Sequence, residues 1–205
     1  SVSEALGDRA SIFTMPAGEE HKTRQTWARL SDEMLEAGFG RDTVVVALGG
    51  GVVGDVAGFV AATFMRGVPV VQVPTTLLAM VDASIGGKTG VDTGHGKNLV
   101  GAFHNPSAVL IDPLVLSTLP ERHLRAGLAE MIKHGVIADA AYFRSVKEFL
   151  TDAGRAPLLA ELISRWVQIK ATIVARDERE LNLRKILNFG HTIGHAIEAA
   201  SDYKL

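Results

Sequence analysis

The sequence of 205 residues contains no cysteine. Disulfide frameworks, thiolate zinc sites and cysteine nucleophiles are therefore excluded. An excess of basic charge is also missing, because 21 Lys and Arg residues stand against 23 Asp and Glu residues, which argues against nucleic acid as a partner. Long apolar runs are absent too, since the longest candidate, VVGDVAGFVAATFM, carries Asp55 and glycines. We therefore expect neither a nucleic-acid-binding protein nor a membrane-spanning one.

The two ends of the sequence have the pattern of interrupted helices. The opening residues, SVSEALGDRA, read as the tail of a helix and contain no apolar stretch typical of a signal peptide. The closing residues fall inside a helix or just past it. We expect a fragment of a longer protein. The absence of cysteine fits a reducing cytoplasm, where we expect the protein to act.

The first half of the chain alternates β-branched apolar runs with helical patterns, which predicts an α/β domain whose parallel sheet is covered on both faces. From about residue 113 onward only helical patterns follow, so we predict an all-α second domain, with domains at 1–112 and 113–205. The expected strands are 11–15, 43–48, 68–73 and 107–112, and the expected helices are 21–39, 52–64, 77–85, 120–137, 140–150, 157–178 and 183–201.

A glycine-rich turn, LGGGVVGD, places Gly49, Gly51 and Gly54 in the G-x-G-x-x-G pattern between a predicted strand and a predicted helix. This context is typical of dinucleotide binding, where a pyrophosphate approaches the backbone at a helix N-terminus. A tight strand–helix turn uses glycine for steric reasons as well. The acidic residue that usually follows about twenty positions on is missing. The candidates to replace it at the ribose are Glu19, Lys22, Asp55, Thr75 and Thr76.

A second glycine-rich stretch, SIGGKTGVDTGHGKN, carries Lys88 and Lys97. Asp82–Thr89 differs by one residue from a phosphate-binding P-loop. We reject that interpretation because a helical pattern precedes it and a hairpin pattern with a glycine turn follows. Two cations on a glycine-rich hairpin suit an anion such as a phosphate. Solvated lysines on a flexible hairpin remain the alternative.

The last predicted helix places four polar residues on one face, because their spacing is i, i+4, i+7 and i+11. They are Arg184, Asn188, His191 and His195, and the opposite face carries Ile186, Phe189, Ile193, Ile197 and Ala200. Gly190 and Gly194 lie beside the histidines, which suggests the close approach of a ligand or another helix. Two histidines four residues apart can bind one metal ion, although single helix histidines are usually structural. Glu130 is the upstream candidate for an oxygen ligand, or else a surface acid.

Several stretches, taken together and in order, resemble the 3-dehydroquinate synthase family of the shikimate pathway, which supplies aromatic amino acid biosynthesis. They are GEEHKT, ALGGGVVGDVAGFVAATFMRG, VPTTLLAMVDASIGGKTGVDTGHGKN, AGLAEMIKHGVI, RDERE and LRKILNFGHTIGHAIE, and they span nearly the whole chain. The resemblance implies an α/β N-terminal domain with a parallel sheet plus an all-α C-terminal domain.

The resemblance also implies a chemistry. The family converts 3-deoxy-D-arabino-heptulosonate 7-phosphate into 3-dehydroquinate and phosphate by transient oxidation, phosphate elimination, reduction and aldol closure. It is a carbon–oxygen lyase that uses NAD and a divalent metal, zinc or cobalt, and it acts as a homodimer.

Site residues follow from the resemblance position by position. Glu130 and His191 correspond to two of three metal ligands, and we expect the third, a histidine in a His-Gly-Glu stretch, beyond Leu205; His195 then contacts substrate. If these 205 residues are the whole molecule, we expect weak metal binding and little or no activity. For substrate, the corresponding residues are Arg66 (donated across the dimer), Asp82, Lys88, Asn98, Lys133, Lys170, Glu180, Arg184 and Asn188. For NAD, they are Glu19, Lys22, Gly50, Gly51, Val52, Asp55, Thr75, Thr76, Lys88, Lys97 and Thr118.

Three other functions fit parts of the pattern. A related sugar-phosphate cyclase would make a different carbocycle, and a metal-dependent alcohol dehydrogenase of the glycerol-dehydrogenase type would share the fold. The cations Lys88, Lys97, Lys170 and Arg184 favour an anionic substrate over glycerol. A truncated NAD-binding module without metal uptake is the non-enzymatic alternative.

Overall fold

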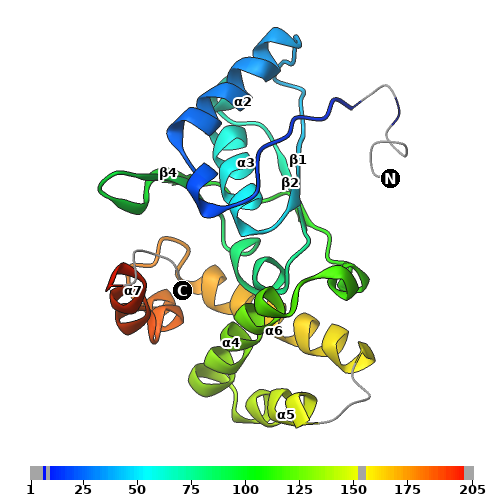
Figure 1. Cartoon of the computed structure of the whole chain (residues 1–205), viewed down its shortest axis with the longest axis vertical. Coiled ribbons are helices and arrows are strands. Elements are labelled where there is room, and N and C mark those ends of the chain that lie inside the picture. The colour runs from blue at the N-terminus through cyan, green and yellow to red at the C-terminus, as the bar shows by residue number, and fades with distance from the viewer. Residues whose placement is uncertain (1–6, 8–9, 152–155, 201–205) are drawn as a thin grey trace. The chain divides into compact units, whose positions relative to one another are not determined.

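The structure of the protein is a computed structural model that describes residue 7 and residues 10–151 and 156–200 (Figure 1). By packing, the chain forms two compact units. Unit 1 comprises Ser1–Pro74 with Gly87–Leu110, and unit 2 comprises Thr75–Gly86 with Ile111–Leu205. The units differ from the predicted domains in the segment Thr75–Gly86, which packs with the helices of unit 2.

Unit 1 contains a parallel sheet of three strands, as the β-branched runs predict. The strands are β1 (Val45–Gly49), β2 (Val70–Pro74) and β5 (Ala108–Val109), in the order β1–β2–β5. The register pairs Val45 with Val70 and Val71 with Ala108. The carboxyl ends of β1 and β2 therefore lie side by side, which is where ligands of parallel sheets usually bind.

The predicted strand at 11–15 is not formed. Phe13 and Met15 pack against the core of unit 1, but this segment pairs with no strand among the residues that the structure describes. Its apolar residues therefore serve packing alone, because a strand also requires a hydrogen-bonded neighbour.

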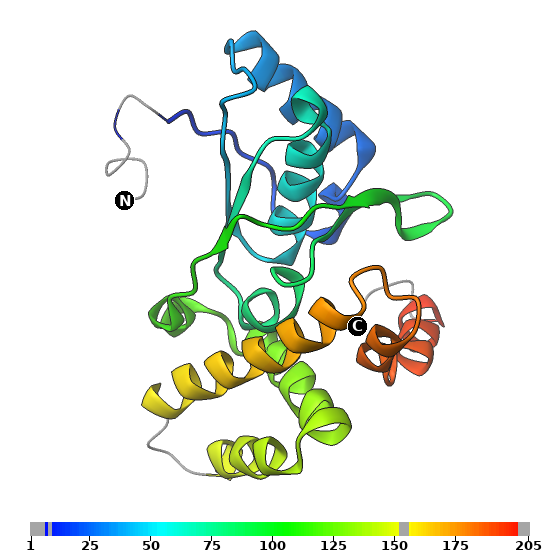
Figure 2. The same cartoon turned by 180° about the vertical axis from the view of Figure 1, so that it is seen from behind.

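One face of the sheet carries the helices of unit 1. The helices α2 (Arg24–Glu36) and α3 (Gly51–Thr63) lie on the same side of β1 and β2 in both views (Figures 1 and 2). On the other face Val46 and Leu48 are 41% and 51% exposed. The expectation of a sheet covered on both faces is therefore not met within the described part of the chain.

The core of unit 1 lies between α3 and the sheet, where Val56, Val60 and Val70 are buried. Gly54 makes this close packing possible, because a Cβ atom there would come within 2.7 Å of Oε1 of Gln72. The Gln72 amide instead donates to the Gly54 carbonyl at 3.1 Å. The third glycine of the turn motif thus allows close helix–strand contact.

The glycine-rich stretch forms the predicted hairpin. Strand β3 (Lys88–Thr93) pairs antiparallel with β4 (Gly96–Phe103), and the register shifts between Val91 and Thr93, where Asp92 alone stands opposite the extra residues 97–99 of β4. Preceding elements of unit 1 are the short helices η2 (Glu19–His21) and η3 (Phe64–Arg66).

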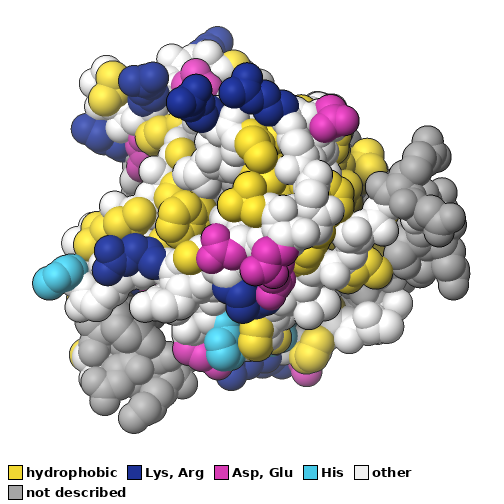
Figure 3. Space-filling model, turned by 90° about the horizontal axis from the view of Figure 1, so that it is seen from above, with side chains coloured by type: hydrophobic (Ala, Val, Ile, Leu, Met, Phe, Trp, Pro, Cys, Tyr) yellow, Lys and Arg dark blue, Asp and Glu magenta, His cyan; other side chains and the backbone are white. Residues whose placement is uncertain are grey.

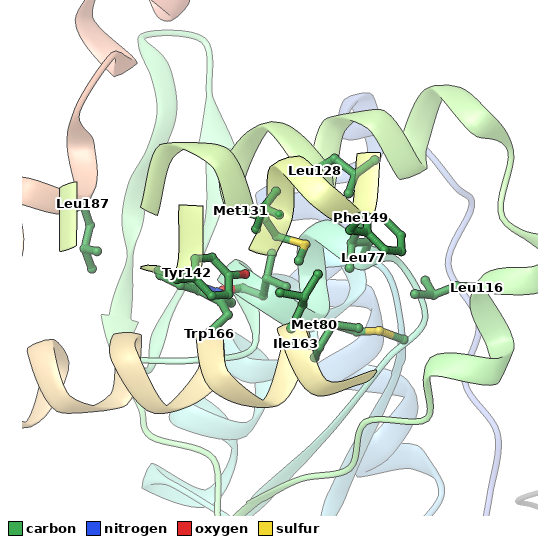
Figure 4. Close-up of a cluster of buried hydrophobic side chains, with 13 residues drawn as sticks. Leu77, Met80, Leu116, Leu128, Met131, Tyr142, Phe149, Ile163, Trp166 and Leu187 are labelled. Atoms are coloured by element: carbon green, nitrogen blue, oxygen red, sulfur yellow. The ribbon is translucent and has the colours of Figure 1, made fainter. Parts of the chain in front are cut away.

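Unit 2 is helical, as predicted. Its long helices are α4 (Glu121–Ala138), α5 (Ala140–Thr151) and α6 (Ala156–Arg176). Two shorter elements precede them in the chain: η4 (Ala79–Ala83), a π-helical turn, and η5 (Pro113–Thr118). Figure 4 shows the core, in which Trp166 and Ile163 of α6 face Tyr142 and Met131. Met80, from the π-helical turn, belongs to the same cluster.

The last predicted helix, 183–201, is wrong as a single element. It consists of η6 (Leu183–Asn188) and α7 (His191–Ala200), and Gly190 between them has a φ of +83°. This left-handed conformation ends the helix, because L-residues with a side chain avoid it. Arg184 and Asn188 therefore do not share a continuous helical face with His191.

Apolar side chains remain on the surface of both units. The predicted core stripe of the last helix is largely exposed, with Phe189 at 59% and Ile193 at 70%. Figure 3 shows hydrophobic side chains between basic and acidic ones on the face that it presents. No helix in the described residues is long and apolar enough to cross a membrane.

Candidate functional site

The glycine turn of unit 1 leaves the start of α3 open. Gly49 ends β1, Gly50 is the N-cap, and Gly51 and Val52 begin the helix. No side chain of the described residues caps this end. The N–H groups of the first turn and the positive end of the helix dipole therefore remain available to an anion.

Next to this turn, a buried lysine joins three segments of unit 1. Lys22 is 3% exposed, and its ammonium donates to Oδ2 of Asp55 on α3 at 2.6 Å and to Oδ1 of Asn98 on β4 at 2.5 Å. The structure thus brings together two residues predicted for NAD and one predicted for substrate. The charge of Lys22 is compensated, which a buried ammonium requires.

The remaining predicted residues of unit 1 are spread more widely. Lys97 lies 3.9 Å from Glu19, a long ion pair between partly exposed side chains. Lys88 begins β3 opposite Phe103, whereas Lys97 lies beside the turn, so roughly 16 Å of strand separates them. The hairpin therefore separates the two cations that the sequence pattern groups around one anion. Arg66 is exposed at the end of η3.

In unit 2, the π-helical turn presents Asp82 to a lysine of α6. The buried Lys170 ammonium donates to Oδ1 of Asp82 at 2.6 Å and also to its carbonyl. Burial raises the pKa of Asp82, but the ammonium outweighs it and lowers that pKa to about 2. One turn earlier on α6, Trp166 donates its indole N–H to the Val81 carbonyl. Two side chains of α6 thus hold two successive residues of the π turn, a type of turn often found at functional sites.

A second cluster joins α4 to the start of α7. Oε1 of Glu130 lies 3.7 Å from Nε2 of His191. The Lys133 ammonium contacts the other carboxylate oxygen of Glu130 and lies 3.4 Å from the same imidazole nitrogen. Its charge also contributes to the low pKa of Asp82, so the two clusters of unit 2 are electrostatic neighbours.

The loop between α6 and η6 is organised by Asp177, which the sequence analysis does not single out. Its carboxylate accepts from the N–H groups of Leu181, Asn182 and Arg184 at 2.7–2.9 Å. These backbone contacts lower the pKa of Asp177. A short carboxylate after a helix is a recognisable signal for such a loop, because Asp commonly binds nearby backbone N–H groups.

Arg184 is buried, at 2% exposure, and its guanidinium faces backbone. One nitrogen donates to the carbonyl of Glu178 at 2.6 Å and another to that of Gly86 at 2.9 Å. Nε lies 3.8 Å from the carboxylate of Glu180, which also accepts from the amide of Asn188. These residues meet through loop geometry, and not through the helical spacing used to predict them.

His134 is a further buried group of unit 2. Its ring stacks on Trp166 with centroids 3.3 Å apart, and it has no exposed surface. Burial and the nearby Lys133 ammonium lower its pKa to about 3. His134 is therefore a neutral imidazole at physiological pH.

Three predicted threonines make local contacts or none that bear on the site. A fourth predicted residue, His195, has a side chain outside the described part of the chain. Thr76 accepts from the N–H of Ala79 at 3.2 Å, so it caps the helical turn that contains Asp82. Thr75 directly precedes it, and Thr118 is exposed, donating to the Val115 carbonyl. His195 belongs to α7, but its side chain is not among those that the structure describes.

Glu130 and His191 of unit 2 lie close enough together to act as two ligands of one divalent cation. A carboxylate oxygen and an imidazole nitrogen on one tetrahedral ion would lie roughly 3.4 Å apart, close to the observed 3.7 Å. The cation between them in this structure is the Lys133 ammonium. Three or more metal-ligating side chains do not gather anywhere in the described residues.

Known proteins place the chain in a family. Residues 12–126 match the family described as 3-dehydroquinate synthase N-terminal, and residues 127–205 match 3-dehydroquinate synthase C-terminal. A 3-dehydroquinate synthase of Pelobacter propionicus is 52% identical over 202 residues, which cover 96% of this chain and 55% of that protein. The chain belongs to the 3-dehydroquinate synthase family, and it spans about half the length of the curated relatives it matches.

Two solved structures resemble the fold closely. One is a 2-deoxy-scyllo-inosose synthase in complex with carbaglucose-6-phosphate, NAD+ and Co2+, which is 35% identical with a TM-score of 0.88 and covers 97% of this chain and 56% of that one. The other is a 2-epi-5-epi-valiolone synthase from Streptomyces hygroscopicus with NAD+ and Zn2+, also 35% identical, with a TM-score of 0.86 over 93% of this chain and 54% of that one.

Proposed function

We propose that this chain acts in the 3-dehydroquinate synthase reaction, the conversion of 3-deoxy-D-arabino-heptulosonate 7-phosphate into 3-dehydroquinate and phosphate. The observation that carries the proposal is the meeting of Glu130, Lys133 and His191 in unit 2, within electrostatic reach of Asp82. Residues distant in sequence thus gather where the family resemblance expects a metal and a substrate. Identity of 52% to 3-dehydroquinate synthases, against 35% to the two other cyclases, favours this substrate.

NAD and a divalent cation are part of the proposal, and two neighbouring structures contain both. The open N-terminus of α3, with Lys22 and Asp55 beside it, fits a dinucleotide, and Glu130 with His191 fits two ligands of zinc or cobalt. When bound, NAD supplies a hydride acceptor and the cation lowers the pKa of a hydroxyl.

The chain's own residues would bind and orient the substrate. Lys133 can donate a hydrogen bond at Nζ to an oxygen held beside Glu130 and His191. Lys170 and Arg184 are the cations proposed for the substrate carboxylate. Both are engaged in this structure, with Asp82 and with backbone carbonyls. To bind an anion, Lys170 or Arg184 must first break one of these contacts. The cation then forms a charge-assisted hydrogen bond to the anion in its place.

A homodimer and a cytoplasmic location complete the proposal. Arg66 is exposed, and the family resemblance assigns it to the substrate phosphate of a second subunit. An exposed guanidinium is suited to this task because it can bind phosphate in bidentate fashion.

Metal uptake tests the proposal directly. We expect Co2+ titrated into the protein to bind, with the visible absorption of a nitrogen- and oxygen-ligated ion, and we expect Glu130→Gln and His191→Ala to abolish that signal. Glu121→Gln is the matched control, because Glu121 is an exposed carboxylate at the start of the same helix. Co2+ binding that survives both ligand substitutions would refute the assignment.

Ligand selectivity separates the rival functions. With NAD+ and Co2+ present, calorimetry should detect binding of 3-deoxy-D-arabino-heptulosonate 7-phosphate and none of glycerol. Preference for a hexose phosphate would point to another sugar-phosphate cyclase. Preference for glycerol would point to an alcohol dehydrogenase, and NAD+ binding without metal uptake to a binding module.

A further inference from the structure

Asp92 lies in β3 of unit 1 where the register with β4 shifts, opposite the extra β4 residues 97–99, which include Asn98. Extra residues on one strand interrupt the regular ladder, so polar groups at that point, on either strand, can bind other partners. The backbone N–H of Asp92 donates to the carbonyl of Lys22 at 2.7 Å, and Thr23 forms an isolated parallel bridge with Asp92. Asp92 therefore attaches the hairpin to the segment that carries Lys22.

The carboxylate of Asp92 makes the second contact. Its Oδ1 accepts from the backbone N–H of Asn98 at 2.8 Å. Asn98 has a φ of +57°, in the left-handed region, which is uncommon for residues other than glycine although asparagine adopts it more readily than most. This conformation directs the Asn98 amide oxygen to the ammonium of Lys22.

These hydrogen bonds link Asp92, Lys22 and Asn98 in a closed ring. Asp92 binds the backbone of Lys22 and the backbone of Asn98, and the Lys22 ammonium binds the side chains of both Asn98 and Asp55. The polar cluster beside the open N-terminus of α3 consists of Lys22, Asp55 and Asn98. One backbone hydrogen bond of Asp92 fixes Lys22 in this cluster, and the other fixes Asn98. Asp92 itself does not belong to any of the residue sets proposed above for NAD or substrate.

We propose that Asp92 is a positioning residue, which fixes Lys22, Asp55 and Asn98 for the dinucleotide and so sets its affinity. The inference rests on the proposed function for its ligand, NAD+. Its structural part, the fixing of Asn98, does not depend on any ligand.

The test compares three variants of the whole chain by calorimetry with NAD+. Asp92→Ala removes the acceptor, and we expect affinity to fall about five- to tenfold, as for one lost charge-assisted hydrogen bond. Asp92→Asn keeps a side-chain oxygen in place and should restore affinity to within about twofold. Thr93→Ala is the control, because Thr93 bonds the backbone of the same turn without contacting Asn98.

Amide hydrogen exchange provides a readout independent of NAD+. The Asn98 N–H should exchange faster in Asp92→Ala, and should stay protected in Asp92→Asn and Thr93→Ala. Unchanged affinity and exchange in Asp92→Ala would overturn the inference, as would an equal loss in Thr93→Ala. If the unmodified chain binds no NAD+, the proposed function fails, and unchanged Asn98 exchange in Asp92→Ala would then overturn the positioning role separately.

Discussion

Lys170 and Asp82 form an ion pair of unit 2 in which the lysine is buried, and each charged group depends on the other for its stability. Side-chain exposure is 6% for Lys170 and 35% for Asp82. Burial lowers the pKa of Lys170, while the Asp82 carboxylate acts against that effect. An ammonium in such a place is retained because the carboxylate compensates it.

Removing the ammonium should therefore leave an uncompensated carboxylate. We expect Lys170→Met to lower the free energy of unfolding at pH 7 by about 2–3 kcal/mol, less than for a fully buried pair because Asp82 is partly solvated. Adding Asp82→Asn should recover part of the loss. Arg125→Met, which breaks the exposed pair with Glu121, should change stability by less than about 1 kcal/mol in urea unfolding. Equal losses from both pairs would contradict this argument.

His134 should make the free energy of unfolding fall as the pH is lowered. Its pKa is about 3 in the folded chain, against 6.5 for an unperturbed histidine, so the unfolded chain binds one more proton between these values. The stability contributed by neutral His134 is complete above pH 6.5 and is lost as the pH falls toward 3. The slope should reach about 1.4 kcal/mol per pH unit.

The measurement is urea unfolding at several pH values between 6.5 and 4. His134→Phe retains an aromatic ring beside Trp166 and should show a shallower loss of stability than the unmodified chain. His123→Gln, an exposed histidine of the same helix, should leave the slope unchanged. Parallel curves for the unmodified chain and His134→Phe would show that this imidazole does not carry the effect.

At the scale of elements, the junction between η6 and α7 determines where His191 lies. Gly190 has positive φ, whereas Gly194 is inside α7, and a Cβ atom at either position would meet no described atom within 4 Å. The two glycines of the same motif therefore have different reasons to be there: a backbone requirement for Gly190, and none that the structure explains for Gly194.

Alanine at the two glycines should act in opposite directions. Gly190→Ala forces a side chain into the left-handed region and should destabilise the junction by about 1–2 kcal/mol. Gly194→Ala should stabilise the helix by about 0.5–1 kcal/mol. Co2+ affinity should fall in the first variant, because His191 loses its place beside Glu130, and should be retained in the second. A loss of Co2+ binding in Gly194→Ala instead would indicate close approach by a ligand.

The sequence predicts helices and strands well where an apolar pattern extends over many residues. It predicts them less well where a single residue ends an element. The helices at 24–36 and 121–138 and the strands at 45–49 and 70–74 follow their apolar patterns closely. The break at Gly190 was missed, because the apolar spacing continues across it while the backbone does not. The segment 11–15 shows the reverse case, an apolar run for which the described residues supply no strand partner.

The sequence proposes a set of residues for the candidate site, and the contacts among them come from the structure. Family resemblance pointed to Glu130 and His191, and the structure brings them together. The contacts of Arg184 with backbone carbonyls, and the roles of Asp92 and Asp177, arise from loop and bulge geometry. No periodic pattern encodes such geometry, because each contact depends on which backbone groups the fold leaves unpaired.

At the scale of the whole molecule, the described residues form two hydrophobic clusters that share no residue. Met34 lies in the cluster of unit 1 and Met131 in that of unit 2, both buried. Each cluster excludes water from its own elements, so each unit carries its own share of the stability.

Matched methionine substitutions should show this division. Met34→Ala and Met131→Ala should each lower local stability by about 2–5 kcal/mol. Amide exchange should accelerate mainly in 10–74 and 87–110 for the first, and in 75–86 and 111–200 for the second. A uniform acceleration across the chain in either variant would show instead that the clusters unfold as one cooperative body.

The two tryptophans of the chain are divided between the units. Trp27 contacts Phe59 and donates to Thr63 in unit 1, whereas Trp166 is enclosed in unit 2 against His134. Each half of the molecule thus carries its own intrinsic fluorophore. Emission from a chain with Trp27→Phe would follow unit 2 alone, and emission from one with Trp166→Phe would follow unit 1, so a spectrometer can watch either half unfold without any added label.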